Sequence, residues 1–208
     1  NANVSYNKNE ITELYNGITE YVASDTGRMV AVGHPLGEFY LNRYAGVNPT
    51  NGDALWYTKD GEITTEYNEN DKVMLGKTHE APWQGGFGTT LSWQGFSLSA
   101  QFTWVADRWM LNNDRVFQES NGLFSAYNQS KRMLYDRWKK PGDVTDIPRY
   151  GVTPQLDSRF LEDASFLRLK NLMLSYTFPQ KWLQRTNFLS SARIYAQGQN
   201  LLTFTSFT

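Results

Sequence analysis

Acidic residues gather just before a strand-like stretch, at Asp157, Glu162 and Asp163. Paired carboxylates could serve as the acid and the base of a glycosidase. The simpler interpretation, which base rates favour, is a solvated loop end or a rim that tolerates calcium. Asp143, Asp146 and Asp157 could offer oxygen ligands to calcium, but their spacing lacks the EF-hand pattern. We therefore expect no catalytic residues and no cofactor, with calcium as a minor alternative.

Other familiar catalytic patterns are missing from the sequence. His34 and His79 are the only histidines, without a neighbouring ligand pattern, and the chain has no cysteine, which argues against a zinc site. It contains no plausible Ser-His-Asp set and no phosphate loop. A net charge of −1 offers no broad basic surface to nucleic acid. We expect neither an enzyme nor a nucleic-acid-binding protein.

The stretch from 107 to 163 holds the side chains best suited to contact a ligand or a partner. Aromatic rings can pack on the apolar faces of sugars, and arginines can pair with acids of a partner. Packing within the loop is the alternative for each ring, and solvation is the alternative for Arg108, Arg115 and Arg149. The candidates are Trp109, Tyr127, Tyr135, Trp138, Arg149 and Tyr150.

The composition predicts an all-β protein. The 208 residues include 7 Trp, 12 Tyr, 12 Phe and 16 Gly, which is typical of strands and turns. Mean hydropathy is −0.56, and no run of 18 apolar residues could form a transmembrane helix. Strands of a membrane barrel escape such a test because they alternate in polarity. The chain begins with Asn1 rather than Met, so we expect a mature or internal fragment.

The clearest pattern is a hairpin from Gly85 to Ala106. Two strands alternate with period two around a turn at Gln94-Gly95, and the second strand, Phe96 to Ala106, spans 11 residues. A tilted membrane strand needs about 9–11 residues. Trp93 and Phe96 flank the turn, and Trp104 and Trp109 mark the far end, as in the aromatic girdles of outer-membrane barrels. The small polar residues of the other face suit a wet lumen, whereas a soluble β-sandwich alternates in the same way.

A second strand pair follows, at Phe166 to Phe178 and Ser191 to Phe204, with a helical turn at Gln180 to Arg185. Arg168 and Lys170 fall on the apolar parity of their strand, which a β-bulge or a position beyond the lipid would explain. If the apolar faces meet lipid, the lipid-facing residues are Phe96, Leu98, Phe102, Trp104, Leu172, Leu174 and Tyr176.

The rest of the chain is less regular. We expect a long extracellular loop at 107–163, with helical spacing from Ser125 to Lys140, because outer-membrane barrels have long loops on one side only. A small hairpin signal lies at Lys59-Asp60-Gly61-Glu62. Further expected strands are Val4 to Asn9, Arg28 to Gly33, Glu38 to Val47, Leu55 to Thr58 and Ile63 to Tyr67.

Several motifs together resemble one known family. The runs SRFLEDASFLRLKN (158–171) and LSYTFP (174–179) look like the C-terminal barrel signature of SusC/RagA-type TonB-dependent transporters, and QGQNLLTFT (197–205) resembles the next strand. The family's long-loop pattern is similar to Trp138, Pro141-Gly142-Asp143 and Pro148-Arg149. A further stretch resembles Tyr44-Ala45-Gly46-Val47-Asn48, Gly52 and Leu55-Trp56-Tyr57.

The resemblance implies a C-terminal part, over residues 1–208, of a large antiparallel transmembrane β-barrel of about 22 strands. It implies import of a glycan or peptide across the outer membrane of a Gram-negative bacterium, with a SusD-like lipoprotein over the extracellular side. TonB would act through an N-terminal plug that, like the closing strands, we do not find here. A soluble carbohydrate-binding β module is the alternative. The sequence does not identify the transported substrate.

Overall fold

A computed structural model describes residues 1–23, 27–124, 126–184 and 188–208. The chain forms two compact units. The strand unit comprises Asn1–Asn7, Ala81–Arg108 and Ala164–Phe207, and the loop unit comprises Lys8–Glu80, Trp109–Asp163 and Thr208. Among the described residues, no helix is long and apolar enough to cross a membrane.

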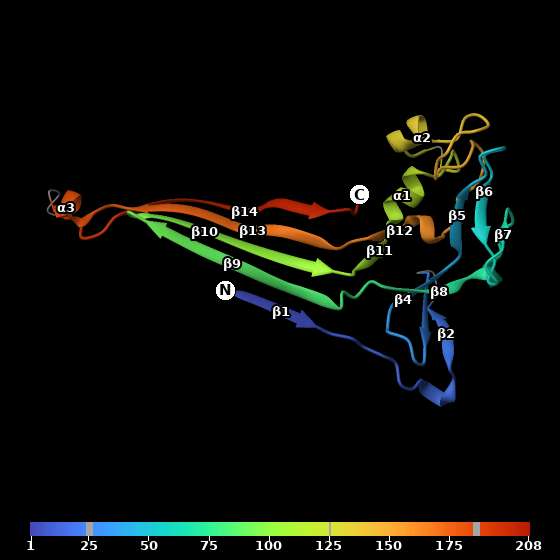
Figure 1. The fold of residues 1–208 in the computed structure, drawn as a ribbon, viewed down its shortest axis with the longest axis horizontal. Coiled ribbons are helices and arrows are strands. Elements are labelled where there is room, and N and C mark those ends of the chain that lie inside the picture. Colours follow the sequence, from blue (N-terminus) through green and yellow to red (C-terminus); the bar gives the residue numbers. More distant parts are fainter. Residues whose placement is uncertain (24–26, 125, 185–187) are drawn as a thin grey trace. The chain divides into compact units, whose positions relative to one another are not determined.

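The strand unit is a five-stranded antiparallel sheet, and it confirms both predicted strand pairs (Figure 1). Helix α3 (Gln180–Leu183) links its last two strands where the helical turn was predicted; Arg185 of that prediction lies outside the described residues. The order across the sheet is β1 (Ala2–Tyr6), β9 (Trp83–Trp93), β10 (Phe96–Ala106), β13 (Phe166–Thr177) and β14 (Arg193–Thr205).

The two-residue turn between β9 and β10 is confirmed. Gln94 and Gly95 both have positive φ, 45° and 89°, which is the geometry that matches the twist of a hairpin. A Cβ at position 95 would lie 2.8 Å from the carbonyl oxygen of Thr177, so glycine is required there for space as well as for conformation. The turn therefore fixes the register of the whole hairpin.

A β-bulge at Lys170 explains the two basic residues on the apolar parity of β13. Gln101 pairs with Asn171 and Phe102 pairs with Leu169, which leaves Lys170 as an extra residue. The bulge reverses the parity of the residues before it, so Arg168 lies on the polar face. Its Nε donates a hydrogen bond to Thr203 Oγ1 at 3.0 Å. Of the two explanations for these basic residues, the bulge is correct.

The loop unit contains three small antiparallel sheets around a compact core. Phe39, Leu41 and Leu161 are buried at the centre of this core, against Leu75, Trp109, Leu111 and Leu156. The first sheet has the order β2 (Glu20–Ala23), β3 (Arg28–Ala31), β4 (Glu38–Leu41) and β8 (Val73–Thr78). The second contains β5 (Arg43–Val47), β6 (Ala54–Tyr57) and β7 (Ile63–Thr64), and the third contains β11 (Trp109–Leu111) and β12 (Leu161–Asp163).

Short helical segments connect these strands. The 3₁₀ turns are η1 (Tyr15–Gly17), η2 (Glu69–Asp71) and η3 (Ser158–Phe160), and the α-helices are α1 (Asn113–Gln118) and α2 (Lys131–Tyr135). The helix expected from Ser125 to Lys140 is therefore too long, because Asp136 ends α2 and Arg137 then forms a bridge with Ile147. Ser125 itself lies outside the described residues.

The predicted strand from Glu38 to Val47 is also wrong in one respect, because it is two strands in different sheets. Asn42 separates them, fully buried, and its backbone pairs with Asp157. The Asn42 side chain donates a hydrogen bond to the carbonyl oxygen of Asn68 at 2.7 Å. The break is a tertiary effect, since both partners are distant in sequence.

The remaining strands predicted in the first half of the chain are confirmed, with different ends. The predicted strands at Arg28, Leu55 and Ile63 correspond to β3, β6 and β7, and the small hairpin lies between β6 and β7. The predicted strand from Val4 to Asn9 corresponds to β1, which ends at Tyr6. Strands β2, β8, β11 and β12 and helix α1 had no counterpart in the sequence analysis. Residues 109–163 share one compact unit with residues 8–80, and the extracellular location of the loop at 107–163 stays a prediction.

Candidate functional site

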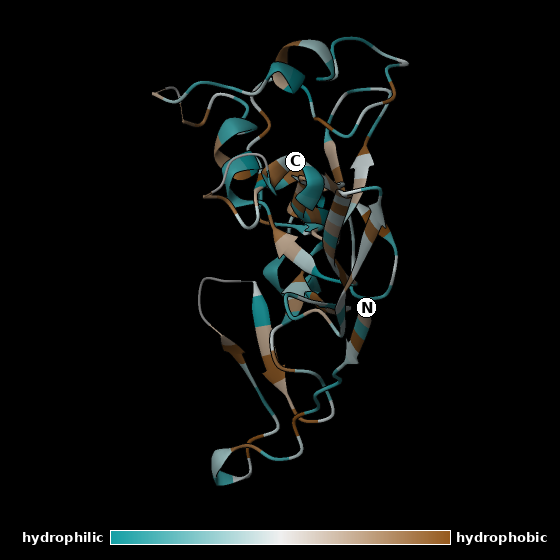
Figure 2. Ribbon diagram, turned by 90° about the vertical axis from the view of Figure 1, so that its left-hand side faces the viewer, coloured by the Kyte–Doolittle hydropathy of each residue, from teal (hydrophilic) through white to brown (hydrophobic). Residues whose placement is uncertain are grey.

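One face of the five-stranded sheet is apolar from edge to edge. The register aligns Leu91, Leu98 and Leu174 across three neighbouring strands, and it aligns Trp93 with Phe96 and Tyr176. Figure 2 shows hydrophobic and hydrophilic bands along the ribbon. The register places all seven residues predicted to face lipid on this face: Phe96, Leu98, Phe102, Trp104, Leu172, Leu174 and Tyr176.

The apolar face is left uncovered by the described part of the chain. Leu91, Leu98 and Leu174 are 63%, 40% and 50% exposed, although they occupy inner strands of the sheet. Aromatic rings pack side by side along it, as between Phe87 and Phe102, whose centroids are 4.8 Å apart. A contiguous apolar surface of this kind marks a contact with lipid or with another protein surface.

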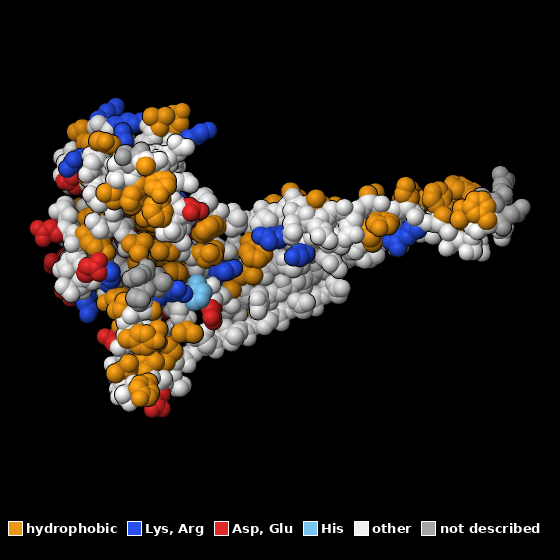
Figure 3. Space-filling model, turned by 180° about the vertical axis from the view of Figure 1, so that it is seen from behind, with side chains coloured by type: hydrophobic (Ala, Val, Ile, Leu, Met, Phe, Trp, Pro, Cys, Tyr) orange, Lys and Arg blue, Asp and Glu red, His pale blue; other side chains and the backbone are white. Residues whose placement is uncertain are grey.

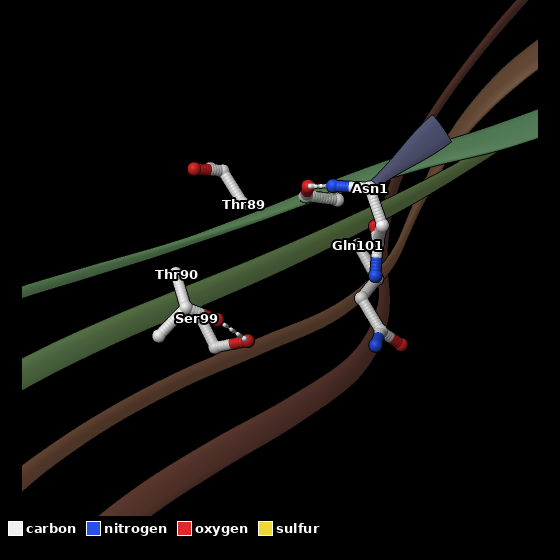
Figure 4. Close-up of a pocket in the computed structure, with 6 residues that line it drawn as sticks. Asn1, Thr89, Thr90, Ser99 and Gln101 are labelled. Atoms are coloured by element: carbon white, nitrogen blue, oxygen red, sulfur yellow. Dashed lines mark hydrogen bonds between the residues drawn. The ribbon is translucent and has the colours of Figure 1, made fainter.

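The opposite face of the sheet is mostly polar and neutral, and it also carries Arg168 and Arg193. Figure 3 shows a broad area of backbone and neutral polar side chains on the extended strands. Within it lies a hollow of about 370 Å³, lined by Asn1, Gly88, Thr89, Thr90, Ser99 and Gln101 (Figure 4). The Asn1 amino group donates to the Gly88 carbonyl oxygen at 3.0 Å, and Thr90 Oγ1 donates to Ser99 Oγ at 3.2 Å. Neutral hydroxyl and amide groups can bind water or a polar ligand.

Two of the six predicted contact residues lie together in the loop unit. Trp138 Nε1 donates to the carbonyl oxygen of Pro49 at 3.2 Å, and Arg149 Nε donates to Asp53 Oδ1 at 2.9 Å. Both side chains lie against Gly52, where a Cβ would come within 2.4 Å of the Trp138 ring. Their role in this geometry is to join the 49–53 turn to the segment 138–149.

The other four predicted residues differ in how much surface they offer. Trp109 lies in β11 against the core of the loop unit, with Lys77 Nζ 3.3 Å from its ring centroid, so it is not part of the five-stranded sheet. Tyr127 packs beside Phe117 and Phe124. The largest exposed fractions belong to Tyr135, 69%, and Tyr150, 66%.

A buried charge cluster was missed by the sequence analysis. Glu119 is 1% exposed and accepts hydrogen bonds from Arg115 Nε at 3.0 Å and from Arg132 Nη1 at 2.6 Å. Arg115 also binds Glu162, and Arg132 binds both carboxylate oxygens of Asp146. Burial alone would raise the pKa of Glu162, but its hydrogen bond from Arg115 holds that pKa below its ordinary value. The i, i+4 spacing of Arg115 and Glu119 was the only local signal.

The carboxylates considered as a possible catalytic pair have separate partners. Asp157 is buried, accepts from Trp56 Nε1 at 2.8 Å and caps η3 through the Arg159 backbone, and burial raises its pKa. Glu162 binds Arg115, and Asp163 lies opposite Trp109 in β12. Asp143 and Asp146 also bind protein donors, and no group of three or more candidate metal ligands gathers among the described residues.

Comparison with known proteins gives a consistent result over nearly the whole chain. TonB-dependent receptor P3 of Formosa agariphila is 28% identical over 230 residues, covering 99% of this chain and 22% of the receptor. TonB-dependent receptor SusC of Bacteroides thetaiotaomicron is 24% identical, covering 95% of this chain and 20% of SusC. A solved structure of the RagAB peptide transporter matches with a TM-score of 0.90 and 38% identity, over 99% of this chain and 23% of the transporter chain. No protein-family model matches.

The chain is homologous to a segment of the SusC/RagA-type TonB-dependent receptors. The predicted fold class, an all-β segment of a large antiparallel barrel, is thereby confirmed, although the sheets of the chain itself are not closed. The chain spans about a fifth of the length of the curated relatives that it matches. Those relatives are named as receptors and a transporter, and none is named as an enzyme.

Two stretches that carried the SusC/RagA resemblance meet at Gly52, which gives a direct test of their role. Replacing Gly52 with alanine should destabilise this contact by about 1–3 kcal/mol, because φ is +78° and the new Cβ would overlap the Trp138 ring. Hydrogen exchange of the backbone amides at 49–53 and 138–149 in the intact protein measures the loss.

A matched control separates ring overlap from backbone strain. Gly61 also has a positive φ, +94°, but a Cβ there would meet nothing within 4 Å. Gly61→Ala should therefore cost only the backbone strain, about 1 kcal/mol, and leave the exchange at 138–149 unchanged. Equal effects of the two substitutions on that segment would show that Trp138 does not depend on Gly52.

Proposed function

We propose that this chain forms part of the wall and extracellular loops of an outer-membrane, TonB-dependent nutrient importer. The observation that supports this most directly is the uncovered apolar face of the five-stranded sheet, opposite a mainly polar face. In a membrane barrel the first face meets hydrocarbon and the second meets the water-filled interior. The SusC/RagA-type relatives support the same assignment.

Strand length and open edges fit this proposal. Strands β9 and β10 each span 11 residues, and a tilted membrane strand needs about 9–11. Strands β1 and β14 lie at the two edges of the described sheet, with unpaired backbone groups that hydrocarbon could not satisfy. We propose that further strands of a longer polypeptide pair with both edges and close a barrel in a Gram-negative outer membrane.

The proposed work of this segment is non-covalent. The loop unit, which carries the exposed Tyr127, Tyr135 and Tyr150, would contact an imported glycan or peptide and a SusD-like lipoprotein. Support for such a partner comes from the RagAB peptide transporter, a complex to which the similar chain belongs. TonB would supply energy through a plug outside the five-stranded sheet.

A soluble carbohydrate-binding module is the rival interpretation. It would need a compact core that covers the apolar side chains of its sheet. The exposure of Leu91 and Leu174 in the strand unit disfavours this interpretation, since both belong to inner strands.

The membrane assignment can be tested with a pair of neighbouring labels in the full-length protein. The chain contains no cysteine, so Ala100→Cys and Gln101→Cys place single thiols in this segment, on opposite faces of β10. An environment-sensitive fluorophore at position 100 should be quenched by vesicles with brominated acyl chains, whereas one at 101 should not. Equal responses, or a folded protein that stays soluble without detergent, would refute the proposal.

A further inference from the structure

A hollow of about 770 Å³ lies in the loop unit, formed by residues 135–146. The segment that lines it follows helix α2 and turns at Pro141-Gly142, with a φ of +95° at Gly142. Tyr135 and Val144 line the hollow and are 69% and 95% exposed, so both offer apolar surface to a bound molecule. The remaining lining is dominated by charged side chains of both signs.

Every carboxylate that lines this hollow already has a partner. Asp143 Oδ2 accepts hydrogen bonds from the backbone N–H groups of Lys139 and Lys140, at 2.9 and 3.0 Å, and these bonds lower its pKa. Asp146 accepts two hydrogen bonds from Arg132, and Asp136 lies 3.6 Å from the same guanidinium. Asp146 therefore uses both of its oxygens within the protein and Asp143 uses one, whereas Asp136 makes only a long contact.

The cations that line the hollow have no carboxylate partner in the described part of the chain. Arg137 lies over the ring of Tyr150, 5.3 Å from its centroid, and Lys139 Nζ donates a hydrogen bond to the carbonyl oxygen of Tyr135 at 3.4 Å. Among the described residues, no carboxylate lies within ion-pair distance of Arg137, Lys139 or Lys140. The three cations that line the hollow are therefore free to bind an anion, although its three carboxylates, Asp136, Asp143 and Asp146, bring the formal charge of the lining to zero.

We propose that this hollow binds a carboxylate-bearing ligand, with Lys139, Lys140 and Arg137 as its charged donors and Tyr135 as a packing surface. Charge-assisted hydrogen bonds to carboxylate oxygens are the strongest that these side chains can form. This rests on the proposed import function, for which it specifies acidic cargo. The carboxylates could belong to an acidic peptide or to uronic acids of a glycan.

The test measures binding to the full-length protein in detergent with four probes. They are a tetrapeptide of aspartate and glutamate, its asparagine and glutamine counterpart, a tetrasaccharide of uronic acids, and a neutral tetrasaccharide. One acidic probe should bind about tenfold more tightly than its neutral counterpart, and that preference should shrink as salt is raised. The acidic probe that is preferred identifies the source of the carboxylate.

Variants assign this preference to the hollow. Lys139→Gln with Lys140→Gln should weaken binding of the preferred acidic probe about tenfold and leave binding of its neutral counterpart unchanged. The control is Lys59→Gln with Lys131→Gln, which removes the same charge from exposed lysines that do not line the hollow. Folding should tolerate both pairs, because all four lysines are exposed.

Two results would overturn the acidic-ligand proposal. One is the absence of any preference for an acidic probe, and the other is a loss of binding in Lys139→Gln with Lys140→Gln that is no greater than the loss in the control variant. Neither result bears on the lipid labelling of position 100. A protein that faces lipid but shows no acidic preference would therefore contradict this inference alone, and an acidic preference without lipid contact would contradict the import function alone.

Discussion

Replacing Glu119 with alanine should destabilise the loop unit by about 3 kcal/mol, near the low end for breaking a buried ion pair. Glu119 is 1% exposed and lies between Arg115 and Arg132, so its removal leaves two guanidinium groups without their shared acceptor. The Arg132 side chain is 37% exposed and can recruit water, which keeps the cost at the low end. Most of the loss should come from Arg115, whose side chain is 16% exposed.

Hydrogen exchange in the full-length protein measures this effect, because it reports local opening without requiring the whole barrel to unfold. Amides of α1 and α2 should lose protection together, since the two helices share Glu119 through Arg115 and Arg132. Asp136→Ala is the matched control: it removes another partner of Arg132, but that pair is 3.6 Å long and exposed. The control should cost less than about 1 kcal/mol. Similar losses of stability in the two variants would show that burial does not strengthen the ion pairs of Glu119.

The strand unit was predictable because its pattern is local. Alternation from Phe87 to Trp104 and the dipeptide Gln94-Gly95 determine face, turn and register without information from elsewhere in the chain. The bulge at Lys170 was open to two explanations, since parity alone shows that a strand is irregular but not why. The register against β10 and β14 decides between them.

The loop unit was harder because its contacts join residues far apart in the chain. Asp157 accepts from Trp56, 101 positions away, and Tyr44 N donates to Ser158 Oγ, 114 positions away. Such contacts break the strand at Asn42, and Asp136 ends α2 early, although the sequence around each site shows no Pro or Gly that would require it. Tertiary packing overrides local propensity in short elements of this kind.

The candidate site was predictable in residue type but not in arrangement. The resemblance singled out Trp138 and Arg149 in one motif and Gly52 in another, and the structure brings all three into one contact. The charge cluster around Glu119 was missed because its partners Arg132 and Glu162 come from other segments. The lipid and ligand roles of the predicted residues stay predictions.

A single arginine on the apolar face should destabilise the protein by about 2–4 kcal/mol in a bilayer, if that face meets hydrocarbon. Leu172 is the best position, because it lies near the middle of β13 and pairs with Ala100 and Gly198, which are too small to shield a charge. Gln101→Arg is the control: Gln101 is exposed on the opposite face, where water would solvate the guanidinium, so we expect a change within about 0.5 kcal/mol.

The two arginine variants should differ in stability because one face contacts lipid and the other contacts water. Both substitutions add the same side chain to the same sheet, so urea unfolding of the full-length protein in lipid vesicles should separate them only through the medium that each face contacts. An arginine placed on the apolar face closer to the strand ends should reduce stability less than Leu172→Arg does, since the penalty for arginine falls toward the membrane interfaces. A cost that is equal on both faces, or unchanged along the strand, would mean that water reaches both sides, and a soluble fold would then account better for this chain.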